Sequence, residues 1–195
     1  MPRHVDQRQR RREIVDATRR VLAERGARGL TFRAVAEEMG GSSTLITHYF
    51  GSRQDLVNGL VEAFAEWPGQ LASLEAGVDD PRERLRLFMR WLVPSNPRGL
   101  TEERARINML GDPDAGINAE RMFNDAETRM RELIAQHLEG LVAPEELPVT
   151  VDLIRSATNG VTLSTVEHPD EWSKERQFAV IDQLLALLGL SAQEE

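Results

Sequence analysis

The chain has 195 residues, of which 41% are hydrophobic, and this excludes a disordered protein and allows a packed core. It contains no cysteine, which excludes disulfides and thiolate metal sites and fits a reducing cytoplasm. No apolar run approaches the roughly 18 residues that a membrane span needs, and none follows the basic N-terminus as in a signal peptide. We therefore expect a globular, cytoplasmic protein without a membrane segment.

The net charge of −8 is unevenly distributed along the chain. Residues 1–60 hold 11 arginines against 7 acidic residues, a balance of +4, and the remainder carries −12. This asymmetry predicts a DNA-binding N-terminal part and an acidic remainder that faces away from DNA. Arg8, Arg10, Arg11 and Arg12 crowd the start of the first predicted helix, where the helix dipole disfavours positive charge. The cluster is expected either to bind phosphate or to be a solvated face.

The first two helices are predicted from caps and apolar spacing. Residues 7–24 form the first, and Gly26 is its expected end. The second begins after Thr31, a typical N-cap residue, and its apolar residues recur at helical spacing as far as Met39. Two glycines then break the pattern, because glycine tolerates the positive φ that a sharp corner needs.

A third helix of barely two turns follows, with Ser42 or Ser43 as its cap. Its apolar residues fall on one side, which leaves four polar residues for the outside: Ser43, Thr44, Thr47 and His48. A helix, a glycine turn and a short helix with a polar face form a helix-turn-helix. The second helix of that motif enters the DNA major groove.

The segment from Leu30 to Leu56 resembles the DNA-binding domain of TetR-family bacterial regulators. It contains the pattern T-x-x-x-V-A-x-x-x-G-x-S-x-x-L-I-x-H-Y-F-x-S-R-x-x-L at the spacing of the family. Gly41 stands where the family usually has a branched apolar residue, and Thr47 where it usually has a tyrosine. The variant L-I-T-H-Y-F and the arginine-rich start are most similar to the choline-responsive, BetI-like branch.

The resemblance implies a DNA-binding domain at residues 1–55 and a ligand-binding and dimerisation domain at residues 56–195. Polar residues of the third helix would face the bases, and the other members of the site would hold phosphates, because phosphate contacts position and base contacts specify. The expected DNA-binding residues are Arg10, Arg11, Arg12, Thr31, Arg33, Ser42, Ser43, Thr44, Thr47, His48, Tyr49 and Arg53.

The remainder of the chain predicts further helices and no strand, so the expected fold class is all-α. The helix from Arg53 runs on to Trp67, and later helices are expected near residues 81–92, 101–110, 113–138, 150–167 and 173–188. The last two have wide apolar faces, and the resemblance implies that they form a four-helix interface between two copies. Its expected residues are Ile154, Gly160, Val161, Phe178, Ile181, Leu184, Leu185 and Leu188.

Aromatic and thioether side chains gather in this second part of the chain. For any one of them, ordinary core packing is the simpler interpretation. As a set they resemble the cavity lining of TetR-family regulators, and Asn159 would orient a ligand there. The expected effector-binding residues are Trp67, Phe88, Trp91, Met109, Phe123, Met130 and Asn159.

No catalytic or metal-binding pattern is present. The four histidines have no second histidine or cysteine at ligand spacing, and no phosphate loop or nucleophile motif occurs. We therefore predict that the protein is not an enzyme and that it binds neither a metal nor a cofactor. The sequence favours a TetR-like repressor that binds a palindromic operator as a homodimer and is released by a small-molecule effector. The alternatives are an effector-independent DNA-binding protein of the same fold and a small helical enzyme with an accidental motif.

Overall fold

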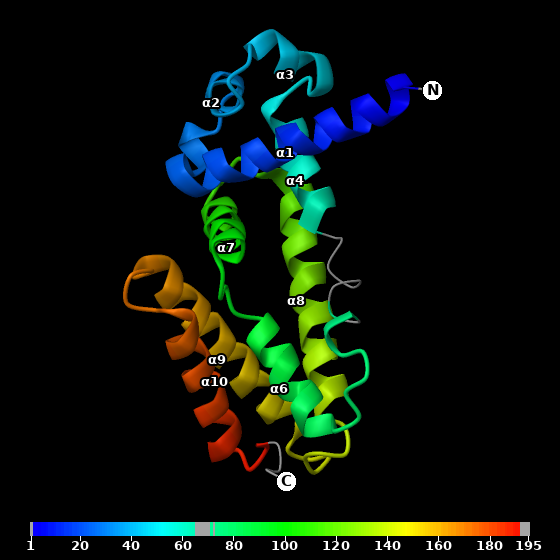
Figure 1. Ribbon diagram of the computed structural model, residues 1–195, viewed down its shortest axis with the longest axis vertical. Coiled ribbons are helices and arrows are strands. Elements are labelled where there is room, and N and C mark those ends of the chain that lie inside the picture. Colours follow the sequence, from blue (N-terminus) through cyan, green and yellow to red (C-terminus); the bar gives the residue numbers. More distant parts are fainter. Residues whose placement is uncertain (1, 65–70, 72, 192–195) are drawn as a thin grey trace. The chain divides into compact units, whose positions relative to one another are not determined.

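The computed structural model describes residues 2–64, 71 and 73–191, and it confirms an all-α chain (Figure 1). Within these ranges no residue belongs to a strand. No helix of the described residues combines the length and the apolar character that crossing a bilayer requires.

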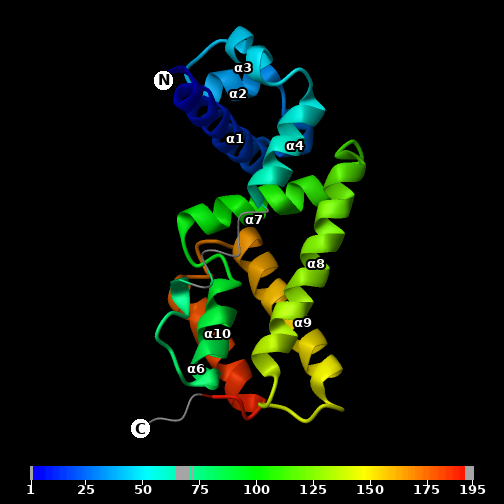
Figure 2. The ribbon, with the colours of Figure 1, turned by 90° about the vertical axis from the view of Figure 1, so that its right-hand side faces the viewer.

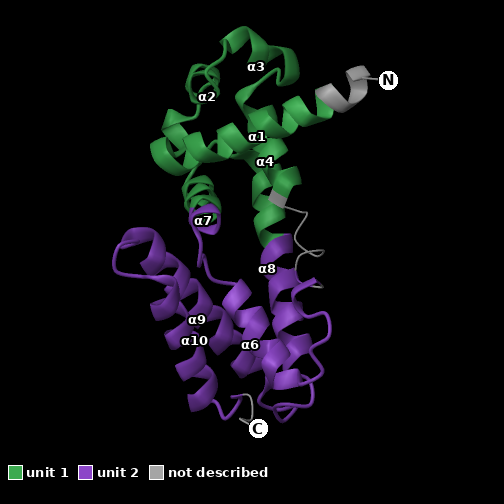
Figure 3. Ribbon diagram, in the orientation of Figure 1, with its two compact units in different colours: residues 1–66, 101–124 green, residues 67–100, 125–195 purple. Residues whose placement is uncertain are grey.

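The chain forms two compact units (Figure 3). Unit 1 comprises residues 1–66 and 101–124, and unit 2 comprises residues 67–100 and 125–195. Residues 101–124 therefore pack with the N-terminal helices.

Unit 1 contains four N-terminal helices and parts of two later ones. Its helices are α1 (Pro2–Gly29), α2 (Phe32–Glu38), α3 (Ser43–Tyr49), α4 (Arg53–Phe64), most of α7 (Pro97–Leu110) and the start of α8 (Gly116–Leu138). α1 begins before the predicted residue 7, and its helical geometry is interrupted at Gly26, where φ is 66°. α2 and α3 begin at capping hydroxyls: Thr31 Oγ1 accepts from Ala34 N at 3.1 Å, and Ser42 Oγ accepts from Leu45 N at 3.4 Å.

The core of unit 1 joins α1 to the three short helices that follow it. A Cβ on Gly59 would lie 3.0 Å from Phe50 Cε1 and 3.1 Å from Val15 Cγ2, so glycine lets α4 approach its neighbours closely. The following core side chains are fully buried: Ile14, Val35, Ile46, Leu56 and Leu60.

Unit 2 consists of helices packed around one apolar core (Figure 2). Its helices are α6 (Pro81–Trp91), the rest of α8, α9 (Leu147–Glu167) and α10 (Lys174–Leu187). Asp182 of α10 accepts hydrogen bonds from Arg86 Nε at 3.1 Å and from Arg90 Nε at 3.2 Å, which ties α10 to α6. The core includes Leu85, Phe88, Met89, Met130, Ile134, Leu138, Val151, Ile154, Val161, Ile181 and Leu185.

Helices α7 and α8 begin at other residues than the sequence predicts. α7 begins at Pro97 rather than Thr101, since Asn96 Oδ1 caps it by accepting from Gly99 N at 2.9 Å, and proline is favoured at the first helical position. α8 begins at Gly116 rather than after Asp112, because Asp112 Oδ1 accepts a hydrogen bond from Asp114 N in the turn that precedes the helix.

Candidate nucleic-acid interface

The short helix α3 has one buried and one exposed side, as its amphipathic sequence predicts. Ile46 is fully buried and fixes the helix to unit 1. Figures 1 and 2 show α3 at one end of unit 1, on the far side of α1 from α7. The polar residues expected to face DNA are all exposed: Ser42, Ser43, Thr44, Thr47 and His48.

The turn between α2 and α3 depends on Gly40 rather than on Gly41. Gly40 has a φ of 64°, and its amide donates to Glu37 O at 3.1 Å. Gly41 has no positive φ, and an added Cβ would meet Leu45 Cδ2 at an ordinary 3.7 Å. The glycine at position 41, where the family usually has a branched residue, is therefore not required by the turn.

Three further predicted contacts belong to the helix-turn-helix: Thr47 and Tyr49 lie on α3, and Thr31 caps α2. The Tyr49 ring is half-buried and stands edge-on to the His48 ring, with centroids 5.2 Å apart. Thr47 Oγ1 donates to Thr44 O at 3.0 Å, so its hydroxyl retains acceptor capacity for a donor on a base edge. Thr31 is exposed at the start of α2 and accepts the capping bond described above.

Most of the arginines predicted to hold phosphates form ion pairs within unit 1. Arg10 contacts Glu13 at 2.7 Å, and Arg33 contacts Glu37 at 2.9 Å. The hydrogen bond from Arg33, followed by one from Arg25, holds the pKa of Glu37 below its ordinary value.

Arg11 and Arg12 differ in what they contact. Arg11 pairs with Glu62 at 3.1 Å, and its guanidinium lies 4.5 Å from the Phe50 ring centroid. Arg12 is exposed and makes no ion pair with any residue that the structure describes. Arg8 is exposed as well and also makes no ion pair with the described residues, so Arg8 and Arg12 are the members of this cluster whose charge is most available.

Arg53, predicted to hold a phosphate, is engaged inside unit 1. Its Nη2 donates to Asp112 Oδ2 at 2.6 Å and to Ala27 O at 3.0 Å. From the sequence, Asp112 was predicted only to start a helix. No periodicity or motif relates two residues so far apart in the chain, so this pairing was missed.

The predicted dimer residues fall into two groups. Ile154, Val161, Ile181 and Leu185 are each at most 4% exposed and form part of the core of unit 2, which leaves them unavailable to another chain. Gly160 is exposed, and the rest are half-buried: Phe178, Leu184 and Leu188.

The predicted effector residues are divided between the units. Met109 and Phe123 belong to unit 1, whereas Phe88, Trp91, Met130 and Asn159 belong to unit 2, and Trp67 lies outside the described residues. Phe88 is fully buried and stacks with Trp91 at a centroid distance of 6.2 Å. Asn159 is exposed.

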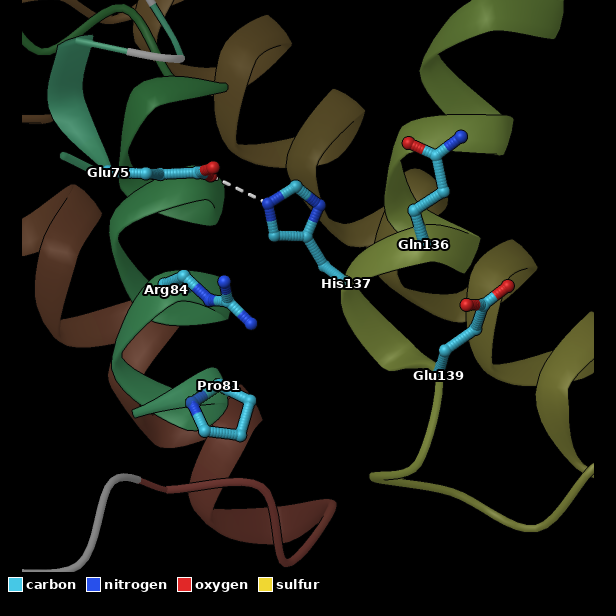
Figure 4. A pocket seen from close by; sticks show the side chains of 6 residues that line it. All are labelled: Glu75, Pro81, Arg84, Gln136, His137 and Glu139. Carbon is cyan, nitrogen blue, oxygen red and sulfur yellow. Dashed lines mark hydrogen bonds and ion pairs between the residues drawn. The ribbon is translucent and has the colours of Figure 1, made fainter. Parts of the chain in front are cut away.

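A hollow of about 180 Å³ in unit 2 is lined by none of these residues (Figure 4). In it, His137 Nε2 lies 2.6 Å from Glu75 Oε1 and His137 Nδ1 lies 2.7 Å from Leu133 O. The imidazole ring stacks on Phe88 at 4.2 Å. The volume of the hollow falls below the roughly 300–1,000 Å³ of typical ligand sites. Both ring nitrogens of His137 already have hydrogen-bond partners. The lining residues are Glu75, Pro81, Arg84, Gln136, His137 and Glu139.

Sequence comparison gives relatives for the whole chain and for its N-terminal motif. The family model described as bacterial regulatory proteins, tetR family, matches residues 14–60. The HTH-type transcriptional regulator PksA of Bacillus subtilis is 31% identical over 195 residues, which cover 94% of this chain and 91% of PksA. The regulator BetI of Brucella anthropi is 35% identical over 77 residues, which cover only 39% of this chain and 40% of BetI.

Solved structures share the fold over most of the chain. A transcriptional regulator from Rhodococcus sp. RHA1 has a TM-score of 0.77 at 19% identity and covers 91% of this chain and 94% of its own. A putative transcriptional regulator from Saccharomonospora viridis, solved in complex with choline, has a TM-score of 0.79 at 18% identity, with coverages of 90% and 95%. At these identities the likeness concerns the fold alone.

Proposed function

Because this chain belongs to the TetR family of bacterial regulatory proteins, we propose that it is a cytoplasmic repressor that binds operator DNA as a homodimer. Family membership identifies a transcriptional regulator with a helix-turn-helix. The operator, the assembly and the effector are our proposals.

The observation that carries the proposal is the exposed polar side of α3 opposite the buried Ile46. A helix anchored in this way presents hydroxyls and an imidazole, which hydrogen-bond to base edges in a major groove. Thr31 and Tyr49 supply a hydroxyl and a phenol for the flanking phosphates, and Arg12 supplies a guanidinium that pairs with no described carboxylate.

The proposed dimer face is an exposed apolar stripe on α9. Val149, Leu153 and Leu163 are 64%, 46% and 46% exposed, and with Gly160 they follow one another at intervals of four, seven and three residues, which places them on one helical face. Apolar side chains aligned on a solvent face indicate a protein–protein contact. α10 adds Val180 and Leu187, which are 38% and 76% exposed. Two copies joined about a two-fold axis would place two α3 helices on successive major grooves.

We propose that an effector binds the C-terminal part of the chain and favours a dimer that no longer fits the operator. The half-buried Trp91, stacked on Phe88, is our candidate for an aromatic contact to that effector. The choline in the S. viridis structure supports a small cationic compound as the first candidate, since tryptophan faces attract quaternary ammonium groups.

The proposal is tested by incubating the purified protein with fragments of its own genome and sequencing the DNA that it retains. We expect one or a few fragments that contain an inverted repeat near a promoter. Retention of DNA without any sequence preference would contradict the operator-binding repressor. Retention that no compound relieves would instead support the effector-independent alternative.

A further inference from the structure

We propose that Arg53 is a positioning residue that joins the two ends of the segment containing α2 and α3, and that Asp112 holds it there while operator DNA is bound. This inference rests on the proposed function, because it concerns how the DNA-binding unit holds its reading helix. It reassigns Arg53 from a phosphate contact to an internal clip, by which we mean the two hydrogen bonds from Arg53 to Ala27 and Asp112.

The position of the clip follows from chain order. α2 and α3 both lie between Ala27 and Arg53. The bond from Arg53 Nη2 to Ala27 O, at 3.0 Å, therefore joins the two ends of the segment that contains both helices. Asp112, in the turn between α7 and α8, fixes the same nitrogen at 2.6 Å. Unit 1 thus supplies an anchor from a distant part of the chain.

The hydrogen-bond inventory of Arg53 leaves no free edge for a two-point phosphate contact. Nη2 has two hydrogens and two acceptors, Ala27 O and Asp112 Oδ2. Both edges on which a guanidinium binds an oxyanion through two parallel bonds, Nη1–Nη2 and Nε–Nη2, include an Nη2 hydrogen. A phosphate held through such an edge would have to displace one of the two acceptors.

Displacing Asp112 is unfavourable because its side chain is only 7% exposed. Without Arg53 the carboxylate would keep just one hydrogen bond that the structure shows, from Asp114 N to Oδ1 at 3.1 Å. A nearly buried carboxylate that loses its cation is strongly destabilised, whereas an exposed pair with phosphate contributes little. The pair with Asp112 therefore persists, and the charge of Arg53 is not available to displace counterions from DNA.

Asp112→Asn tests this directly, because removal of a negative charge would by simple electrostatics tighten DNA binding. We expect the opposite: operator affinity falls about tenfold, the range of coupling between residues in contact. The slope of log affinity against log salt stays unchanged. Asp114→Asn is the matched control, since its exposed carboxylate lies in the same turn, and it should leave affinity unchanged. Arg12→Ala should reduce the slope by about 0.9, the value for one phosphate contact.

Tighter binding and a steeper slope in Asp112→Asn would overturn the inference, because Asp112 would then compete with phosphate for Arg53. A slope reduced by about 0.9 in Arg53→Ala would overturn it as well. Hydrogen exchange of the free protein gives a readout that needs no DNA. Asp112→Asn should accelerate amide exchange across α2 and α3, and unchanged exchange there contradicts the clip. If the wild-type protein selects no operator while the exchange effect is present, the proposed function fails and the clip stands.

Discussion

Thr47 and His48 are neighbours on α3 but offer different chemistry to a base. The Thr47 hydroxyl donates to Thr44 O and so presents acceptor lone pairs and a methyl group. The His48 imidazole, held edge-on by Tyr49, presents ring nitrogens. The two side chains are therefore expected to read different base positions.

Thr47→Ala and His48→Ala should each change base preference at one or two operator positions, by about 1–3 kcal/mol of discrimination per lost contact. Competition between operator variants with single base changes measures this preference. Glu120→Ala, which removes an exposed side chain of α8, is the control and should leave the preference unchanged. If both α3 variants retain the wild-type preference, another element reads the operator.

At this scale the sequence predicted local features well and distant partners poorly. The buried and exposed sides of α3 follow from apolar spacing within seven residues, and the caps at Thr31 and Ser42 follow from residue type. The Arg53–Asp112 pair was not predictable, because it is created by packing α4 against the turn after α7. Similarly, residue type and position in the sequence did not reveal that Arg10 and Arg33 are paired with carboxylates.

Among the helices of unit 2, α6 and α10 are joined by a charged group. Burial alone would raise the pKa of Asp182, but the hydrogen bonds from Arg86 and Arg90 outweigh burial and hold that pKa below its ordinary value. A carboxylate with a lowered folded-state pKa stabilises the fold fully above its unfolded pKa, about 3.9 for aspartate. This contribution is lost as the pH falls through the lower folded-state pKa.

Asp182→Asn should therefore lower the melting temperature of unit 2 at pH 7, and the difference from wild type should shrink as the pH falls below about 4. Thermal unfolding followed by circular dichroism between pH 7 and pH 2 measures both. Asp170→Asn, at an exposed position before α10, should show neither effect. A difference between Asp182→Asn and wild type that stays constant down to pH 2 would contradict this role of the pair.

The α9 stripe allows a substitution that affects assembly without disturbing the protomer. Among the described residues, a Cβ at Gly160 would meet no atom within 4 Å apart from its chain neighbours and the nearby backbone of its own helix, so the folded protomer has space for a larger side chain. Gly160→Leu should obstruct close approach of a second copy and yield monomers by analytical ultracentrifugation. Ser156→Ala, at another exposed position on α9, is the control and should leave the dimer intact. A substitution at Gly140 would not serve, because its φ of 76° strains any side chain. A wild-type monomer at micromolar concentration would refute the proposed dimer.

The two helices of the proposed interface show what helical spacing does and does not specify. It located both helices, with α9 beginning three residues earlier than expected at Leu147. It did not specify which apolar face packs inside the protomer, because α9 has one buried stripe through Ile154 and Val161 and another exposed one through Leu153 and Leu163. Both faces satisfy the same periodicity, so only the fold distinguishes them.

For the whole molecule, the all-α class and the regulator family followed from sequence, whereas the return of residues 101–124 to unit 1 did not. Residues 101–124 pack with the N-terminal helices, and this return of the chain cannot be read from periodicity. The effector residues were similarly inferred as one set, although they are distributed over both units.

Thermodynamic linkage between DNA binding and effector binding constrains the affinities of any effector. A compound that releases DNA must bind the free dimer more tightly than the DNA-bound dimer, by the same factor by which it weakens operator affinity. Trp91→Ala should lower the affinity for that compound and leave the operator affinity of the unliganded protein nearly intact. Calorimetric titration with choline as the first probe, paired with operator titration, tests this expectation. If Trp91→Ala abolishes folding, Trp91 is a core residue, and if it keeps the full response, the effector site lies elsewhere.

The measurement that tests the central claim most directly is selection from random DNA, with the wild-type protein and Gly160→Leu side by side. The account predicts that the wild type enriches an inverted repeat whose half-sites are centred about 34–36 Å apart, or a multiple of that, because one dimer places two α3 helices on one side of the duplex. Gly160→Leu should enrich only the single half-site, at much lower affinity. Recovery of unpaired half-sites by the wild type, or of no preferred sequence, would contradict a dimer that reads DNA through α3.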